Sequence, residues 1–201
     1  MKSLTGYLSE SAGKNTHMTH IEDLILDGGV KGARQAILAL RSLRDMLSGN
    51  SKSPVDITVK WDGAPAVFAG EDPETGEFFV AKKGIFNANP KIYKSHDDID
   101  ADTSGDLSTK LKLAFDNLKD LGIKGVIQGD FMFDKSDLKK ERINGVSHIV
   151  FHPNTIAYAV PADSNLAKEI TKAKIGIVWH TTYSGATFET MRAVSYTHLT
   201  L

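Results

Sequence analysis

The chain has 201 residues, of which 41% are hydrophobic and 24% charged, a composition typical of an ordinary globular protein with one or two domains. Its formal net charge of -1 supplies no overall basic field for nucleic acid, so any contact with nucleic acid would need a local patch. The absence of cysteine excludes disulfides and thiolate chemistry, and no apolar run approaches the roughly 20 residues that a membrane span needs.

The N-terminal region divides into two predicted segments. Residues 1–18 are polar and rich in serine, glycine and threonine, so we expect a loose arm. Residues 19–50 predict two helices, the first beginning at a capping box formed by Thr19 and Glu22 and ending at a pair of glycines. Apolar residues at helical spacing continue the second helix. We expect this helical segment to pack on a domain formed by residues 51–193.

A short stretch with strand periodicity carries the first candidate for chemistry. Apolar and polar residues alternate from Ile57 to Asp62, and a period of two predicts a strand with one apolar and one polar face. Lys60 and Asp62 share the polar face, close to the end that Gly63 and Pro65 impose. A lysine there is either solvated or a rigidly placed reactive group, and the alternation alone leaves both readings open.

A hairpin is predicted immediately afterwards. Residues 72–76 have strong turn chemistry and separate two apolar runs, the second of which ends in Lys82 and Lys83. If the hairpin pairs back on the preceding strand, one of these lysines lies near Lys60. A neighbouring cation there would lower the pKa of the Lys60 amine or bind a phosphate. The alternative is that Lys82 and Lys83 only lie at a solvated strand end.

The next segment is strongly acidic. Residues 94–106 carry several aspartates and few apolar residues, a spacing that suggests a calcium loop. Thr103 stands where such a loop needs glycine, and Thr109 stands where it needs the closing glutamate, so we reject that reading. We expect a surface loop followed by a helix over residues 107–121, which has one apolar stripe.

A second chemical candidate lies in the apolar run from Gly125 to Phe133. This run predicts a buried strand interrupted at Gly129 and Asp130. A carboxylate among apolar residues is costly unless it is paired or bound to a metal, so Asp130 is a stronger functional candidate than any aspartate of the loop. An Ile-Asn-Gly turn signal at residues 143–145 then predicts a further hairpin.

The remaining pattern favours an α+β fold. Strands are predicted over residues 155–160 and 174–183, with a helix over 164–173 between them. Strands in runs separated by single helices fit this class better than a parallel α/β sheet. We expect one antiparallel sheet, covered by helices over 30–47, 107–121 and 164–173, that carries Lys60, Lys82, Asp130, Tyr158 and Val178.

Two of these segments resemble motifs of the covalent nucleotidyltransferases, the group that contains ATP-dependent DNA ligases, RNA ligases and mRNA capping enzymes. Lys60-Trp61-Asp62-Gly63 resembles the K-x-D-G signature of that group. Gly129-Asp130 resembles its third motif, in which a glycine precedes a glutamate on a strand, although the acid here is one methylene shorter. The two motifs occur in the order that the group has.

Two later segments extend this resemblance. Residues 155–160 are similar to the strand that places an aromatic ring against the nucleotide base, with Tyr158 as the ring or, equally, as a core tyrosine. Gly176-Ile177-Val178 resembles the E-G-x-V motif, but Ile175 replaces the metal-associated glutamate. Gln128 and His180 are the polar residues that stand as substitutes for it.

The resemblance implies an ATP-grasp-like ligase adenylation domain. Lys60 would attack the α-phosphate of ATP to form lysyl-AMP, with Mg2+ and Lys82 or Lys83 stabilising the phosphate charge. Asp130 would hold metal or ribose. The nucleotide would contact Asp62, Gly63, Lys82, Lys83, Tyr158 and Gly176. AMP would then pass to a nucleic-acid end carrying a 5′-phosphate. The alternative is a catalytically inactive protein that binds a nucleotide or assembles with a partner.

A broader resemblance covers the run from Thr16 to about Tyr183, which is similar to an uncharacterised protein family of tailed phages, particularly those of marine cyanobacteria. This match names no activity. Because the sequence has no membrane-span run and its polar N-terminus lacks the apolar core of a signal peptide, we expect a cytoplasmic protein, in the infected host cell, with no membrane contact. Residues 194–201 resemble translated sequencing-adapter sequence, so we expect a non-native tail on a metagenomic fragment cut off near Ala193. The last motif of the ligases, a K-x-K strand, would then be missing.

Overall fold

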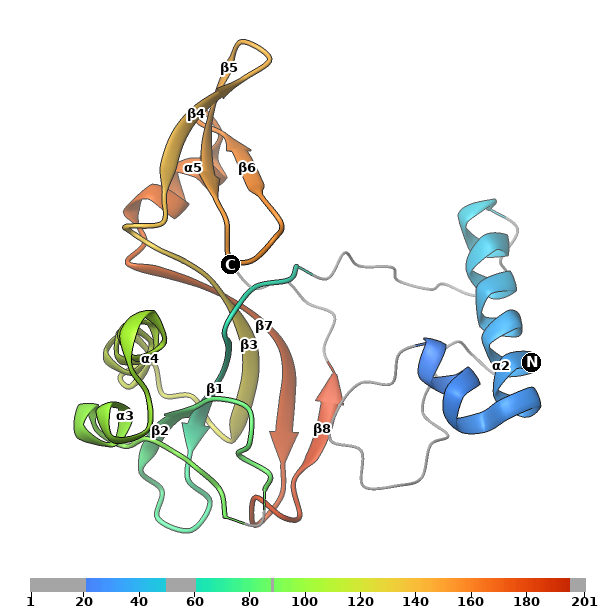
Figure 1. The fold of residues 1–201 in the computed structure, drawn as a ribbon, viewed down its shortest axis with the longest axis horizontal. Coiled ribbons are helices and arrows are strands. Elements are labelled where there is room, and N and C mark those ends of the chain that lie inside the picture. Colours follow the sequence, from blue (N-terminus) through green and yellow to red (C-terminus); the bar gives the residue numbers. More distant parts are fainter. Residues whose placement is uncertain (1–20, 50–60, 88, 196–201) are drawn as a thin grey trace. The chain divides into compact units, whose positions relative to one another are not determined.

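The computed structural model describes residues 21–49, 61–87 and 89–195, and the chain divides into two compact units, Met1–Val59 and Lys60–Leu201. The first unit contains helix α2 (Ile21–Leu47), drawn in blue in Figure 1. Gly29 breaks this helix with φ 52° and ψ -133°, a backbone conformation that glycine adopts without steric cost. Two helical arms joined at the glycine pair are therefore confirmed, and their packing on the second unit stays a prediction.

A five-stranded antiparallel sheet forms the centre of the second unit, with strand order β2-β1-β3-β7-β8. The long strands β3 and β7 run side by side along its middle (Figure 1). Asp130 on β3 pairs with Ala66 on β1 and with Val178 on β7. The five strands are β1 (Ala66–Glu71), β2 (Phe78–Ala81), β3 (Val126–Asp134), β7 (Ile175–Ser184) and β8 (Arg192–Ser195).

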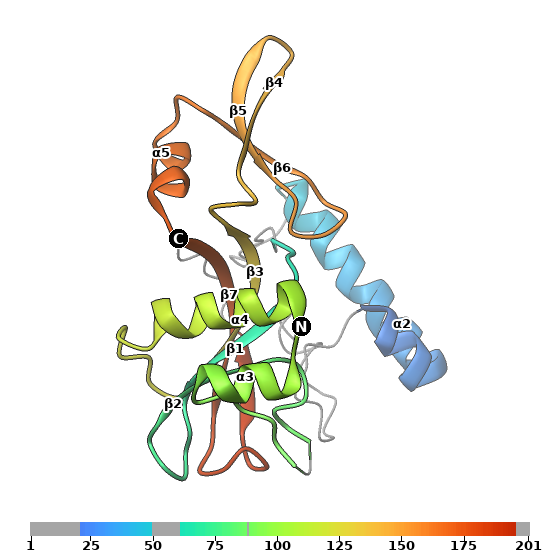
Figure 2. The same ribbon diagram turned by 60° about the vertical axis from the view of Figure 1, so that its left-hand side comes forward.

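The two faces of this sheet belong to different hydrophobic cores, because successive side chains of a strand point to opposite faces. Helices α3 (His96–Asp102) and α4 (Gly105–Leu118) lie across one face (Figure 2). There, Leu111 of α4 and Val67 of β1 are fully buried in one cluster. On the opposite face, Phe68 of the same strand packs with Tyr183 in a second cluster.

A separate three-stranded sheet, in the order β4-β5-β6, follows β3 in the chain. Its strands are β4 (Lys139–Ile143), β5 (Val146–Phe151) and β6 (Tyr158–Pro161), and α5 (Asn165–Lys172) packs against it. Asn144 and Gly145 form the predicted hairpin turn with φ of 49° and 82°. The prediction of a single sheet carrying both Asp130 and Tyr158 is wrong, because β6 pairs with β5 and not with the strands around β3.

The acidic segment is a helix and not the predicted surface loop. The Ser95 side chain caps the N-terminus of α3 by accepting a hydrogen bond from the Asp98 amide, 3.1 Å away. Ile99 anchors the helix because it is fully buried in the cluster beneath α4. A single buried residue gives no periodic pattern in the sequence, and the run of aspartates around it suggested a loop instead of a helix.

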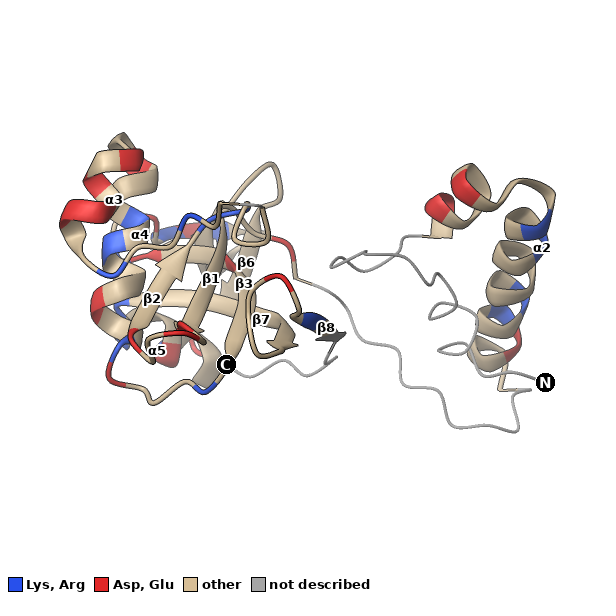
Figure 3. Cartoon of the chain, turned by 90° about the horizontal axis from the view of Figure 1, so that it is seen from below, with Lys and Arg blue, Asp and Glu red and all other residues tan. Residues whose placement is uncertain are grey.

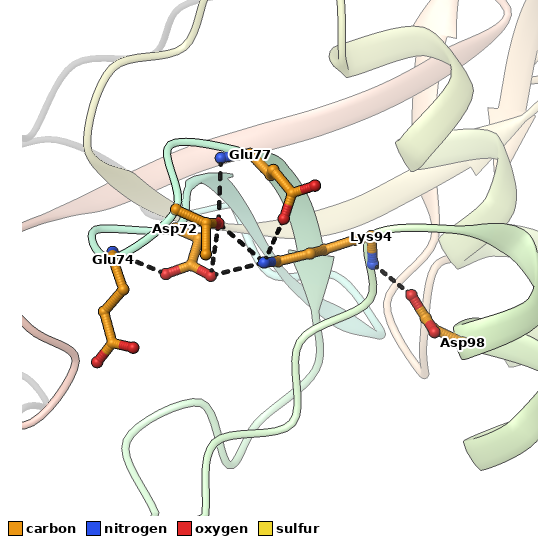
Figure 4. A network of polar contacts seen from close by, with 6 residues as sticks. Asp72, Glu74, Glu77, Lys94 and Asp98 are labelled. Carbon is orange, nitrogen blue, oxygen red and sulfur yellow. Dashed lines mark hydrogen bonds and ion pairs between the residues drawn. The ribbon is translucent and has the colours of Figure 1, made fainter.

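An ion-pair network ties the β1–β2 hairpin to the start of α3 (Figure 4). Lys94 contacts Asp72 at 2.8 Å and Glu77 at 2.7 Å, and its amide donates to Asp98. Burial raises the pKa of Asp72, but hydrogen bonds from Lys94, the Glu74 amide and the hydroxyl of residue 75 outweigh it, so the pKa is lowered overall. The predicted turn at residues 72–76 is confirmed, and the ion pairs of Lys94 with Asp72 and Glu77 stabilise it.

The class of the fold is as expected: the described residues form a mixed α+β structure with antiparallel sheets and four helices. The helices predicted over 107–121 and 164–173 are α4 and α5. In the described part of the chain, no helix combines the length and the apolar character that a membrane crossing requires. Lys60 and most of the strand predicted before Asp62 lie outside the described residues, while Trp61 and Asp62 themselves are not in a strand.

Candidate functional site

The segment after the candidate lysine packs directly on β3. A side chain at Gly63 would place its Cβ 2.5 Å from the Phe131 carbonyl oxygen, closer than a Cβ approaches such an atom, and 3.1 Å from the Cβ of Asp130, which is a tight contact. The Ala64 amide donates to that carbonyl at 3.1 Å, and the Phe131 amide donates to the carbonyl of Pro65 at 2.9 Å. Glycine is therefore required at position 63, and this close approach places Gly63 beside Asp130.

Asp130 is a buried carboxylate in the interior of the sheet, with only 6% of its surface exposed. Strand β3 runs through Gly129 and Asp130 without a break, although its pairing with β7 is irregular beside them. The irregularity lies in the neighbouring strand: Gln128 pairs with Thr181, whereas Gly129 pairs with Trp179. Strand β7 thus carries one extra residue at this point, which is a β-bulge.

The extra residue of the bulge is His180, and it reaches Asp130. Its Nε2 lies 3.6 Å from Asp130 Oδ1, and its Nδ1 lies 2.8 Å from the Thr181 hydroxyl oxygen. Nε2 is buried and has no hydrogen-bond partner among the described residues. A bulge re-aims a side chain locally, so the structure brings a buried imidazole nitrogen to the carboxylate at the centre of the candidate site.

The position that aligns with the missing glutamate does not face Asp130. Ile175 packs, like Ile177 and Trp179, against the core on the α3–α4 side of the sheet. Val178, which pairs with Asp130, alternates with these residues and therefore points to the other face. Gly176 is explained by packing, because a side chain there would overlap the ring of Phe133. Its proposed contact with a nucleotide stays a prediction.

Tyr158 reaches the site from the second sheet. Its hydroxyl accepts a hydrogen bond from the Asp62 amide at 2.9 Å and donates one to the Asp62 carbonyl at 3.0 Å. Its ring stacks on Trp61, with centroids 5.0 Å apart, and on Phe151, with centroids 5.5 Å apart. The residue therefore holds Trp61 and Asp62 in place, and its role as the ring against a base stays a prediction.

The Asp62 side chain has a partner that the sequence did not reveal. Asn154 donates from its side-chain amide to Asp62 Oδ2 at 2.9 Å. The same asparagine accepts from the Ile156 amide through its side-chain oxygen at 2.7 Å, so its orientation is fixed from both ends. Asn154 lies between β5 and β6 in a loop with no periodicity, and only its turn-forming residue type marks it.

The two candidate lysines differ in their surroundings. Lys82 forms an ion pair with Asp102 at the end of α3, at 2.8 Å. Asp102 also accepts hydrogen bonds from Lys91 and Tyr93, and the three donors hold the pKa of this carboxyl well below its usual range. Lys83 is exposed and makes no ion pair with the described residues. Lys82 thus fastens α3 to β2, while Lys83 stays available to a ligand.

Asp100 of α3 is engaged by side chains of α4, and Figure 3 shows the acidic and basic residues of these neighbouring helices. Lys112 pairs with Asp100 at 2.6 Å, and the Ser108 hydroxyl donates to the same carboxylate at 2.8 Å. Among the described residues, no group of three or more histidine or acidic side chains is placed to hold a metal ion. Asp100 therefore helps to hold α3 against α4.

A protein-family model matches residues 15–200, and its description is a family of unknown function (DUF6267). The matched stretch includes every described residue of the candidate site. No curated protein and no solved structure matches the chain. The chemistry must therefore be argued from the geometry around Asp62, Asp130 and His180.

Proposed function

The chain belongs to this family of unknown function, and we propose that it is a ligase-like nucleotidyltransferase that forms a lysyl-AMP intermediate from ATP and acts on nucleic-acid ends. One observation carries the proposal: Gly63 of the K-x-D-G segment packs on β3 beside Asp130, the acid of the segment resembling the third motif. The two segments are far apart in sequence. A chemistry that needs a lysine and an acid around one nucleotide requires this convergence.

The proposed first step is the attack of Lys60 on ATP. The Nζ–phosphorus bond forms at the α-phosphate, the bond to the bridging oxygen breaks, pyrophosphate leaves with that electron pair, and the amine proton passes to solvent. A lysine with an ordinary pKa of about 10.4 is almost wholly protonated at neutral pH, so a neighbouring cation is needed to favour the free amine. Lys83 suits this role better than Lys82, which is paired with Asp102.

The proposed second step transfers AMP. An oxygen of a 5′-phosphate on the nucleic acid attacks the same phosphorus, and the Nζ–phosphorus bond breaks to regenerate the Lys60 amine. A divalent cation, Mg2+ by resemblance to the ligases, would neutralise charge on the phosphates when bound. Asp130 is a buried carboxylate that fits an oxygen-seeking cation or a ribose hydroxyl.

The test is adduct formation. The protein is incubated with ATP labelled at the α-phosphate and Mg2+, and the covalent product is separated under denaturing conditions. We expect a labelled protein that withstands alkali and loses AMP in acid, as a phosphoramidate does. Lys60→Arg should abolish the label, because a guanidinium keeps the charge but cannot lose a proton to attack. Lys124→Arg, at an exposed lysine paired with Glu71, should leave it unchanged.

A second candidate is a catalytically inactive phage protein on the same fold that binds a nucleotide or assembles with a partner. It is favoured by Ile175, which points to the α3–α4 core and leaves the fourth motif without its acid. In this case ATP binds reversibly and no adduct forms. Either activity would operate in the cytoplasm of an infected host cell, as the resemblance to tailed-phage proteins implies.

A further inference from the structure

We propose that His180 and Asp130 together bind a first-row transition cation, such as Mn2+ or Zn2+, in preference to Mg2+. The proposal rests on the proposed function only for the nucleotide, whose phosphates would complete the coordination. It starts from a buried nitrogen, His180 Nε2, that has no hydrogen-bond partner among the described residues and faces a carboxylate. A buried polar atom without a partner is costly, and a bound ion is one of the explanations for such an atom in a native protein.

The distance between the two atoms suits a shared ion better than a direct hydrogen bond. Nε2 and Asp130 Oδ1 are 3.6 Å apart, beyond the range of about 2.7–3.2 Å for a nitrogen donor and an oxygen acceptor. Two ligands that each lie about 2.1 Å from a cation at a tetrahedral angle are roughly 3.4 Å apart. A shift of a few tenths of an ångström would therefore seat an ion between them.

The other ring nitrogen is arranged as metal-binding histidines require. Coordination by Nε2 needs a lone pair there, which places the proton on Nδ1. Nδ1 lies 2.8 Å from the Thr181 hydroxyl oxygen, which can accept that proton in a hydrogen bond. Thr181 is only 5% exposed and is fixed in β7 opposite Gln128. This partner sets the tautomer and the ring orientation, as an outer-shell group does for a metal ligand.

The donor pair also determines which cation is preferred. Mg2+ selects oxygen ligands, whereas imidazole suits transition cations. Within the described residues, no third histidine or acidic group joins His180 and Asp130. Phosphate oxygens and water would therefore fill the remaining positions. The enzymes that Gly176-Ile177-Val178 resembles use a glutamate just before the matching glycine, and here an imidazole that reaches Asp130 from the bulge would replace that oxygen ligand by a nitrogen.

The experiment detects the nitrogen directly. The full chain is loaded with Mn2+, alone and with α,β-methylene-ATP, and pulsed electron paramagnetic resonance is used to find the nuclear modulation of a coordinated ¹⁴N. We expect an imidazole signal. His180→Gln should remove it and weaken Mn2+ binding by at least about 10-fold, and Asp130→Asn should weaken binding to a similar extent. Thermal unfolding of each variant confirms that the fold persists.

A matched control is available on another part of the same unit. His96 is an exposed histidine whose Nε2 lies 2.9 Å from Asp116, so it forms a direct histidine–aspartate contact. His96→Gln should leave the ¹⁴N signal and the Mn2+ affinity unchanged. His180→Glu should restore an all-oxygen pair and shift the preference from Mn2+ toward Mg2+ in a competition titration.

The outcomes separate this inference from the proposed function. Absence of imidazole modulation in the natural chain, both with Mn2+ alone and with nucleotide, overturns the cation site, and so does a signal that persists in His180→Gln. An imidazole signal that depends on His180, in a chain that forms no adduct with ATP, supports the cation site and refutes the ligase mechanism. Adduct formation with a metal preference that His180→Gln does not change refutes the cation site alone.

Discussion

The hydroxyl of Tyr158 is bonded twice to the backbone of Asp62, accepting from its amide and donating to its carbonyl. One side chain of the second sheet thereby satisfies both backbone groups of the residue that follows Trp61. The ring beneath this hydroxyl stacks on Trp61 itself. The conformation of residues 61–63 thus depends on a residue from β6 as well as on β3.

Removal of this hydroxyl is expected to loosen the segment. Tyr158→Phe keeps the stacked ring and loses both hydrogen bonds, which should lower the free energy of unfolding by about 1 kcal/mol. Under the proposed function it should also weaken ATP binding several-fold, because Asp62 and Gly63 would no longer be held. Urea unfolding and a nucleotide titration measure the two effects.

The matched control is Tyr183→Phe. The Tyr183 hydroxyl donates to Gln128 Oε1 at 2.6 Å inside the second hydrophobic cluster, away from Asp62. This change should lower stability by about 1–3 kcal/mol, because it leaves a buried acceptor unsatisfied, but it should not alter nucleotide affinity. Equal losses of affinity in both tyrosine variants would show that the effect is a general loosening and has no link to Asp62.

Position 63 is expected to reject even a methyl group. Gly63→Ala places a Cβ 2.5 Å from the Phe131 carbonyl oxygen and 2.7 Å from Met132 Sδ. The backbone must shift, so the free energy of unfolding should fall by about 1–3 kcal/mol in a chemical denaturation experiment. Gly28→Ala, where a Cβ meets open space, should be neutral or slightly stabilising. A stable Gly63→Ala protein would contradict the close approach to β3.

The Lys94 network makes a prediction for acid stability. The pKa of Asp72 is lowered in the folded protein, as is that of Glu77. In the unfolded chain a carboxyl takes up protons from about pH 4 downward, before the folded one does, so stability falls as the pH drops below about 4 toward the folded pKa. Lys94→Met removes the shared cation and should flatten this pH dependence while lowering stability at neutral pH.

Urea unfolding at a series of pH values between neutrality and about pH 2 checks this slope. Lys124→Met serves as the control, since Lys124 pairs with Glu71 and takes no part in the network around Asp72. Its curve should run parallel to that of the unaltered protein. A slope that Lys94→Met leaves unchanged would mean that the acid sensitivity arises elsewhere in the molecule.

The two adjacent lysines after β2 should separate structure from binding. Lys82→Met leaves Asp102 with one cation fewer and should lower the thermal midpoint, since the pair fastens α3 to β2. Lys83→Met removes an exposed charge and should leave the midpoint where it is, while weakening ATP binding several-fold. Calorimetry and a nucleotide titration measure both quantities. The reverse pattern would assign the phosphate contact to Lys82.

Sequence patterns found the elements that depend on local chemistry. The turn between β1 and β2 follows from the residues at 72–76, and β3 and β7 follow from long apolar runs. Helix α3 was missed because one residue, Ile99, supplies its buried face. Strand β8 was missed because its four residues form no recognisable period. Division into two sheets depends on pairings between distant segments, which no local pattern encodes.

The site was predictable only in part, for the same reason. The burial of Asp130 could be predicted, because this carboxylate lies in a long apolar strand. The direction of the His180 side chain could not be predicted, because it depends on how β7 pairs with β3. A shift of one residue in this pairing reverses the face of every side chain in the strand. The contact between Asn154 and Asp62 joins a loop to a distant segment, so it could be read only from the folded chain.

The place of β3 in the sheet has a consequence for hydrogen exchange. Around Asp130 this strand is bonded to β1 on one side and to β7 on the other, so its amides exchange only when the middle of the sheet opens. The Asp62 amide is bonded to a tyrosine hydroxyl in an exposed setting. Deuterium should enter there first. Brief local openings would therefore free Asp62 while β3 around Asp130 keeps its structure. A ligand could then reach the site through the residues around Asp62 without opening the sheet.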